Sequence, residues 1–168
     1  MFRRKFLSLA VAFAIVAFAI VAFVGAPAHA DRALLAVDTT GYEADIRSLT
    51  DADLMALPQT EFTTTTIWTD GPITFSGPSL AAVLEAVGAT GANVSMVAVN
   101  DYKVDMPQSR IEDGAPIIAN RINGAPFGIR DKGPLWVVFP FDQSERYQTE
   151  EIYSLSVWQL THLRVLPE

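Results

Sequence analysis

The segment Arg130-Asp131-Lys132-Gly133 has the residue types of an anion-binding site. An arginine guanidinium offers a planar set of donors to phosphate or carboxylate, a lysine adds a point charge, and glycine lets the backbone approach a ligand closely. An exposed turn with solvated charges would have the same sequence. Residues 31–168 hold only nine basic side chains, so two in one turn favour binding. Arg121 is a third candidate for this site, with a surface arginine at a strand end as the alternative.

A second candidate site is the turn Asn100-Asp101-Tyr102, which places an amide, a carboxylate and a phenol together. Asn and Asp are also common in turns for backbone reasons, so a purely structural role stays open. Trp68 is the tryptophan best placed to stack on a ligand ring, because it follows a polar segment and precedes a turn. Tryptophan in a small domain is usually a core residue, and Trp136 lies within an apolar run.

No catalytic or metal-ligating residue is expected. The chain has no cysteine, which excludes disulfides, thiolate metal sites and cysteine nucleophiles. Its two histidines are His29, in the leading segment, and His162, on the outer face of a predicted strand, so a multi-histidine metal site cannot form. Acidic pairs such as Glu150-Glu151 fit helix starts or loops, where solvent and the helix dipole stabilise them.

The charge balance limits the class of partner. The first thirty residues hold three of the twelve basic side chains and none of the nineteen acidic ones, so residues 31–168 carry a net charge of −10. Such a surface repels phosphate backbones and anionic lipids, so neither nucleic acid nor peripheral lipid binding is expected. A small anionic or heterocyclic ligand, or a membrane-bound envelope protein, remains as the expected partner.

Residues 1–30 have the pattern of a signal peptide. Arg3-Arg4-Lys5 precedes an apolar run from Phe6 to Val24, and Ala28-His29-Ala30 resembles a cleavage site. The two arginines also fit a twin-arginine signal, and the run is long enough to act as an uncleaved inner-membrane anchor. We therefore expect residues 31–168 to form one domain, periplasmic or otherwise extracytoplasmic.

Two short helices are predicted to position these residues. Thr50 and Asp53 form a capping box for a helix that runs through Ala56. Ser79 caps a second helix that ends at Gly88 and has one apolar face, formed by Leu80, Val83, Leu84 and Val87.

The remaining apolar segments predict strands. Asn100-Asp101 and Asn123-Gly124 should each make a turn between two of them, and the apolar run 135–139 should be a central strand buried on both faces. In the last strand, Leu163 and Val165 should face inward and Arg164 outward. The predicted strands are 61–66, 73–75, 94–99, 102–105, 117–122, 127–129, 135–139 and 160–166. The fold class predicted is α+β, with a mixed β-sheet and short helices.

Several motifs, in this order and spacing, resemble the molybdopterin-binding domain of the sulfite oxidase family. The similarity covers about Thr50 to Val165. The motifs are Phe75-x-Gly77-Pro78-x-Leu80, Asn100-Asp101-Tyr102, Asn123-Gly124-x-Pro126, Gly133-Pro134-Leu135-Trp136-Val137-Val138-x-Pro140 and Leu163-x-Val165.

This resemblance implies a sulfite oxidase-type fold, with the Asn100 turn near the cofactor pocket. In that family a pterin dithiolene and one cysteine hold molybdenum, and the cysteine follows the strand before the helix. The matching stretch here, residues 62–68, has threonine hydroxyls and no sulfur. A hydroxyl is a poor ligand for a soft metal. The resemblance thus allows molybdopterin as a cofactor, whereas bound molybdenum is not expected.

Two functions follow as hypotheses. The first is an exported, non-catalytic ligand-binding or interaction module of the sulfite oxidase fold. The alternative is a periplasmic molybdenum oxidoreductase that holds its cofactor without a cysteine.

Overall fold

The computed structural model describes residues 32–166. The expected signal peptide therefore lies outside the described residues. The α-helices are α1 (Asp51–Ala56), α2 (Leu80–Ala86) and α3 (Glu150–Ser154), and four 3₁₀ helices, η1 to η4, span Gln108–Arg110, Ile129–Asp131, Phe141–Gln143 and Glu145–Tyr147. The strands are β1 (Ala33–Asp38), β2 (Ile46–Thr50), β3 (Gln59–Thr64), β4 (Ile73–Pro78), β5 (Asn93–Ala98), β6 (Lys103–Pro107), β7 (Ile117–Ala119), β8 (Arg121–Ile122), β9 (Trp136–Val138) and β10 (Leu160–Leu166).

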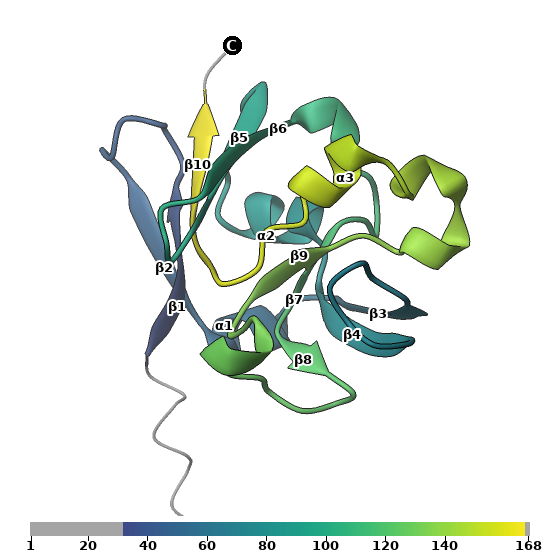
Figure 1. Ribbon diagram of the computed structural model, residues 1–168. Coiled ribbons are helices and arrows are strands. Elements are labelled where there is room, and N and C mark those ends of the chain that lie inside the picture. Colours follow the sequence, from purple (N-terminus) through teal and green to yellow (C-terminus); the bar gives the residue numbers. More distant parts are fainter. Residues whose placement is uncertain (1–31, 167–168) are drawn as a thin grey trace, which may run out of the picture.

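The largest sheet has five strands in the order β2-β1-β10-β5-β6. β1 and β10 are parallel and the other pairs are antiparallel, so the sheet is mixed. A three-stranded sheet, β3-β4-β8, and a two-stranded sheet, β7-β9, complete the fold. In Figure 1 the five-stranded sheet stands on the left and β3 and β4 lie at the lower right, with β7 and β9 between them. Mixed sheets with few short helices confirm the predicted α+β class.

Both predicted helices form where their caps predict. The Thr50 hydroxyl accepts from the Asp53 amide and the Asp53 carboxylate accepts from the Thr50 amide, which completes the capping box of α1. The Ser79 hydroxyl accepts from the Ala82 amide at the start of α2, and Gly88 takes a positive φ of 70° after its end. The apolar face of α2 enters the core.

The last strand, β10, also follows its sequence pattern. Leu163 and Val165 are buried and His162 is exposed. The strand lies between β1 and β5, so its inward side chains pack in the centre of the large sheet.

One predicted strand is absent from the structure, and another is divided into two. Residues 127–129 are not a strand, because Ile122 and Ala125 make only one bridge after the Asn123-Gly124 turn. Pro126 lacks the amide that would extend this ladder, and the chain instead enters η2.

The predicted strand 117–122 is divided at Asn120. Its first part, β7, pairs with β9, and its second part, β8, pairs with β4. The apolar run 135–139 is buried on both faces as predicted, but β9 lies in the two-stranded sheet and not at the centre of the largest one.

Candidate functional site

A cavity of about 310 Å³ opens on the surface where three segments meet. They are the residues after β3, the turn between β5 and β6, and the chain from α3 to β10. Four of the lining side chains are aromatic: Trp68, Tyr102, Tyr153 and Trp158. The rest are Ala98, Asn100, Ser154, Ser156 and Val157. The structure therefore brings together three of the residues singled out from the sequence, Trp68, Asn100 and Tyr102.

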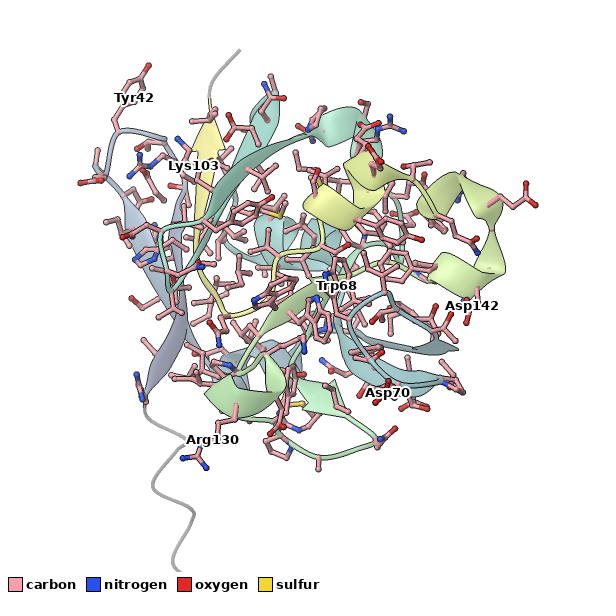
Figure 2. All side chains as sticks on the ribbon, in the orientation of Figure 1. Tyr42, Trp68, Asp70, Lys103, Arg130 and Asp142 are labelled. Carbon is pink, nitrogen blue, oxygen red and sulfur yellow. The ribbon has the colours of Figure 1, made fainter. Side chains whose placement is uncertain are left out.

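Trp68 is the centre of the aromatic cluster behind this cavity and lies near the middle of the view in Figure 2. Its ring centroid is 5.4 Å from that of Trp158 and 5.9 Å from that of Tyr153, with interplanar angles of 69° and 89°. Trp136 lies behind it at 6.0 Å and is fully buried. Edge-to-face packing of this kind stabilises aromatic pairs by about 0.5–1.5 kcal/mol beyond the area they bury.

The turn Asn100-Asp101-Tyr102 holds one wall of the cavity. Asp101 takes a positive φ of 62° and its amide donates to the Ala98 carbonyl, as the predicted turn requires. The Asn100 side chain accepts from the Tyr102 amide at 3.2 Å. The Tyr102 hydroxyl donates to the Ser154 carbonyl at 3.0 Å, which joins the turn to the end of α3. Asp101 is exposed and does not line the cavity.

Gln159 connects this turn to η2. Its amide donates to the Lys132 carbonyl at 3.0 Å and its side chain to the Ile129 carbonyl at 2.9 Å, while its own carbonyl accepts from the Val99 amide. The η2 turn therefore lies next to the Asn100 turn. Arg130 and Lys132 do not line the cavity, however.

The cationic turn has two differently placed side chains. Arg130 is exposed and points away from the body of the molecule at the lower edge of Figure 2. Lys132 turns back, and its ammonium nitrogen lies 5.9 Å from the centroid of the Trp136 ring. Gly133 is buried, and a Cβ there would come within 2.3 Å of the Phe127 carbonyl oxygen. The backbone of Phe127 thus already occupies the space that glycine leaves open.

Arg121 does not extend toward a ligand. Its guanidinium binds the Asp51 carboxylate with two hydrogen bonds, 2.8 Å and 2.7 Å, and also donates to the Asn120 carbonyl. The hydrogen bond from Arg121 lowers the pKa of Asp51, against the effect of partial burial, and the Arg121 charge and the Asn120 amide add to it. This pair joins β8 to α1.

The residues that the sequence resemblance matches to a metal ligand do not fit molybdenum. The Thr65 hydroxyl donates to Asp142 at 2.7 Å, and the Thr64 hydroxyl accepts from the Asp142 amide at 3.0 Å. The Thr66 hydroxyl is hydrogen-bonded to the Thr69 hydroxyl. The donor set is thus made of neutral hydroxyls already hydrogen-bonded within the protein, with no thiolate among them. Nowhere in residues 32–166 do three or more His, Asp or Glu side chains gather as a metal cluster would require.

Sequence reasoning missed Tyr153 and ranked Trp158 below Trp68 as a stacking residue. Tyr153 lies on α3, a five-residue helix that was not predicted, and Trp158 lies between α3 and β10. The available signal was the Thr149 cap before Glu150-Glu151, which is typical of a helix start. The Thr149 hydroxyl indeed accepts from the Ile152 amide.

Comparisons with known proteins bear on the fold alone. Neither family models nor the sequences of curated proteins match this chain. The crystal structure of the sulfane dehydrogenase SoxCD from Paracoccus pantotrophus is similar, with a TM-score of 0.60 and 17% sequence identity. The similarity covers 80% of this chain and 38% of that chain, so the present chain spans well under half the length of its neighbour. No helix within residues 32–166 has the length and apolar character needed to cross a bilayer. With its mixed sheets and short helices, the chain has a sulfite oxidase-type α+β fold.

Proposed function

We propose that this protein is an exported, non-catalytic binding module of the sulfite oxidase fold, and that its ligand is a small organic molecule held in the aromatic cavity. The observation that carries the proposal is the convergence of Trp68, Tyr102, Tyr153 and Trp158 on one open cavity of about 310 Å³. Small-ligand pockets span about 300–1,000 Å³ and are mostly apolar with a few polar groups, which is the character of this lining.

The small number of acid-base groups in the cavity supports binding over chemistry. No Asp, Glu, His, Lys or Arg of residues 32–166 lines it, which leaves the phenols of Tyr102 and Tyr153, and the Tyr102 hydroxyl already donates to the Ser154 carbonyl. His162 lies on the exposed face of β10, and its ring nitrogen Nδ1 is hydrogen-bonded to the Thr161 hydroxyl. The engaged hydroxyls of Thr64 to Thr66 count against the alternative of a molybdenum oxidoreductase.

The test is a ligand panel followed by tryptophan fluorescence and melting temperature. Two of the three tryptophans line the cavity, so a bound ligand should change the emission saturably. The panel contains flat heterocycles such as pterins, phosphates and carboxylates, and small organic cations. Tyr102→Ala should weaken binding, whereas Tyr42→Ala, which removes a phenol 75% exposed on a distant loop, should not. If no class binds, or if Tyr102→Ala binds as the wild type does, the proposal fails.

Export is the second part of the proposal and rests on residues 1–30. Intact-mass measurement of protein recovered from the cell envelope should give Asp31 as the first residue. Recovery of the full-length chain only from detergent-extracted membranes would instead show an uncleaved anchor.

A further inference from the structure

We propose that the aromatic cavity binds the quaternary ammonium group of a small organic cation. This inference rests on the proposed function, because it concerns the same cavity, and it adds the chemical class of the ligand. Three features of residues 32–166 carry it: the angles between the rings, the charge of the lining, and a cation that the same aromatic cluster already holds.

Trp68 pairs edge to face with its neighbours and forms no parallel-sided slot with them. A flat heterocycle stacks best between parallel faces, whereas Trp68 meets Tyr153 at 89° and Trp158 at 69°. The aromatic rings that line the cavity therefore lie in different planes, which suits a rounded group better than a flat one. A trimethylammonium group is rounded, and the negative face of each aromatic ring attracts its charge.

The charge of the lining selects this cation among other ligands. No basic side chain of residues 32–166 lines the cavity, so an anionic group would find no counter-charge there. No acidic side chain lines it either, so a primary ammonium ion would lose its strong hydration without a carboxylate in return. A quaternary ammonium ion has no N–H to satisfy and is more weakly hydrated, so it loses less on entering an apolar cavity. The net charge of −7 for the whole chain attracts cations over a longer range.

The aromatic cluster already holds one cation of the protein itself. The Lys132 ammonium lies 5.9 Å from the centroid of Trp136, whose ring packs at 6.0 Å against Trp68. Trp136 does not line the cavity, so Lys132 does not fill the proposed site. The four aromatic side chains that line the cavity are left to an external cation. Asn100 and Ser154, at the exposed end, suit a hydroxyl carried on the same ligand.

The experiment compares a charged probe with its neutral isostere on the full-length protein. Choline and 3,3-dimethyl-1-butanol have the same shape, but only choline carries the positive charge. Titrations followed by tryptophan fluorescence should show choline binding about three- to thirtyfold tighter, the range that one cation–π contact supplies. Tetramethylammonium should bind and ammonium should not.

A pair of variants tests whether choline binds in the cavity. Tyr102→Leu keeps an apolar side chain but removes one ring face, and should weaken choline binding about three- to thirtyfold while leaving binding of the neutral isostere nearly unchanged. Tyr42→Leu is the matched control on an exposed loop and should change neither titration. Circular dichroism of both variants checks that they are folded.

The outcomes separate this inference from the proposed function. Equal affinity of the wild type for choline and its neutral isostere overturns the cation assignment. So does a Tyr102→Leu variant that binds choline as tightly as the wild type does. If pterins or other flat heterocycles bind and quaternary ammonium ions do not, the ligand class is wrong and the binding module stands. If nothing in the panel binds, both proposals fall.

Discussion

Arg121 and Asp51 show how one ion pair can look like a binding site in the sequence. The two side chains expose only 15% and 28% of their area, and the guanidinium meets the carboxylate in a two-point contact at 2.8 Å and 2.7 Å. Asn120, fully buried beside them, donates to the same carboxylate at 3.0 Å. A contact between residues seventy positions apart in the chain leaves no local pattern, so the sequence could not distinguish this pair from a free arginine.

This ion pair predicts an acid-dependent loss of stability. The folded state lowers the pKa of Asp51, so the stabilisation is complete above its ordinary value of about 4 and is lost as the pH falls through the lower folded value. Asp51→Asn should therefore reduce the free energy of unfolding by about 1–3 kcal/mol at pH 7, and the difference from the wild type should shrink toward pH 2. Urea unfolding at several pH values measures it. Asp70→Asn, at an exposed turn, is the control, and a difference that stayed constant with pH would contradict the assignment.

Arg130 remains the best candidate for an anion contact outside the cavity. It is exposed, with no ion-pair partner among residues 32–166, on a surface with few other cations. If an anion binds there, Arg130→Ala should weaken it about ten- to a hundredfold and change stability by less than about 0.5 kcal/mol. Melting temperatures against phosphates and carboxylates measure both, with Lys103→Ala as the control. A wild type that responds to no anion would leave this turn as a solvated surface.

At the scale of elements, Asp142 joins β3 to η3 at the segment that the sequence resemblance matches to a metal ligand. The Asp142 carboxylate accepts from the Thr65 amide at 2.6 Å and from the Thr65 hydroxyl at 2.7 Å. The hydroxyl bond and then the amide bond lower the pKa of Asp142. These contacts fix the segment that leads from β3 to Trp68, and so support one wall of the aromatic cavity.

Removal of this carboxylate should loosen that segment. Asp142→Ala is expected to lower the free energy of unfolding by about 1 kcal/mol, since the side chain is exposed and its bonds compete with water. A sharper readout is hydrogen exchange at the Thr65 amide, which should lose protection. Asp131→Ala, in the 3₁₀ helix η2, provides a matched aspartate whose loss should leave Thr65 unchanged. Undiminished protection of Thr65 in Asp142→Ala would show that the amide is held by something else.

Local sequence signals predicted the elements that depend on local contacts. The capping box of α1, the cap and apolar face of α2, and the alternation of β10 are all decided within a few residues. β1 and β2 were missed, because Thr39 to Asp45 between them form a long connection organised by the Asp38 carboxylate. The partners of β7, β8 and β9 were also not predictable, since each pairs with a strand distant in sequence. For the same reason the cavity was only partly predictable. Trp68 and Tyr102 were candidates from the sequence, whereas Tyr153 and Trp158 come close to them only in the folded chain.

At the scale of the whole molecule, a sulfite oxidase-type fold occurs here in a chain that spans 38% of its structural neighbour. One hydrophobic core holds this fold together. A continuous set of buried side chains runs from the large sheet through α2 to β7 and β9. The chain has no cysteine, so no disulfide within it stabilises this core.

The consequence for the whole molecule is that protein purified from its native cells should carry no stoichiometric molybdenum. The chain has no thiolate, and the threonine hydroxyls that stand in its place are engaged with Asp142 and with one another. A metal would have to break these hydrogen bonds before any of the hydroxyls could coordinate it. Elemental analysis of the purified protein measures the metal, with a sulfite oxidase-family enzyme prepared in the same way as the positive control. One molybdenum per chain, retained through gel filtration together with a fluorescent pterin released on denaturation, would reject the binding module and restore the oxidoreductase.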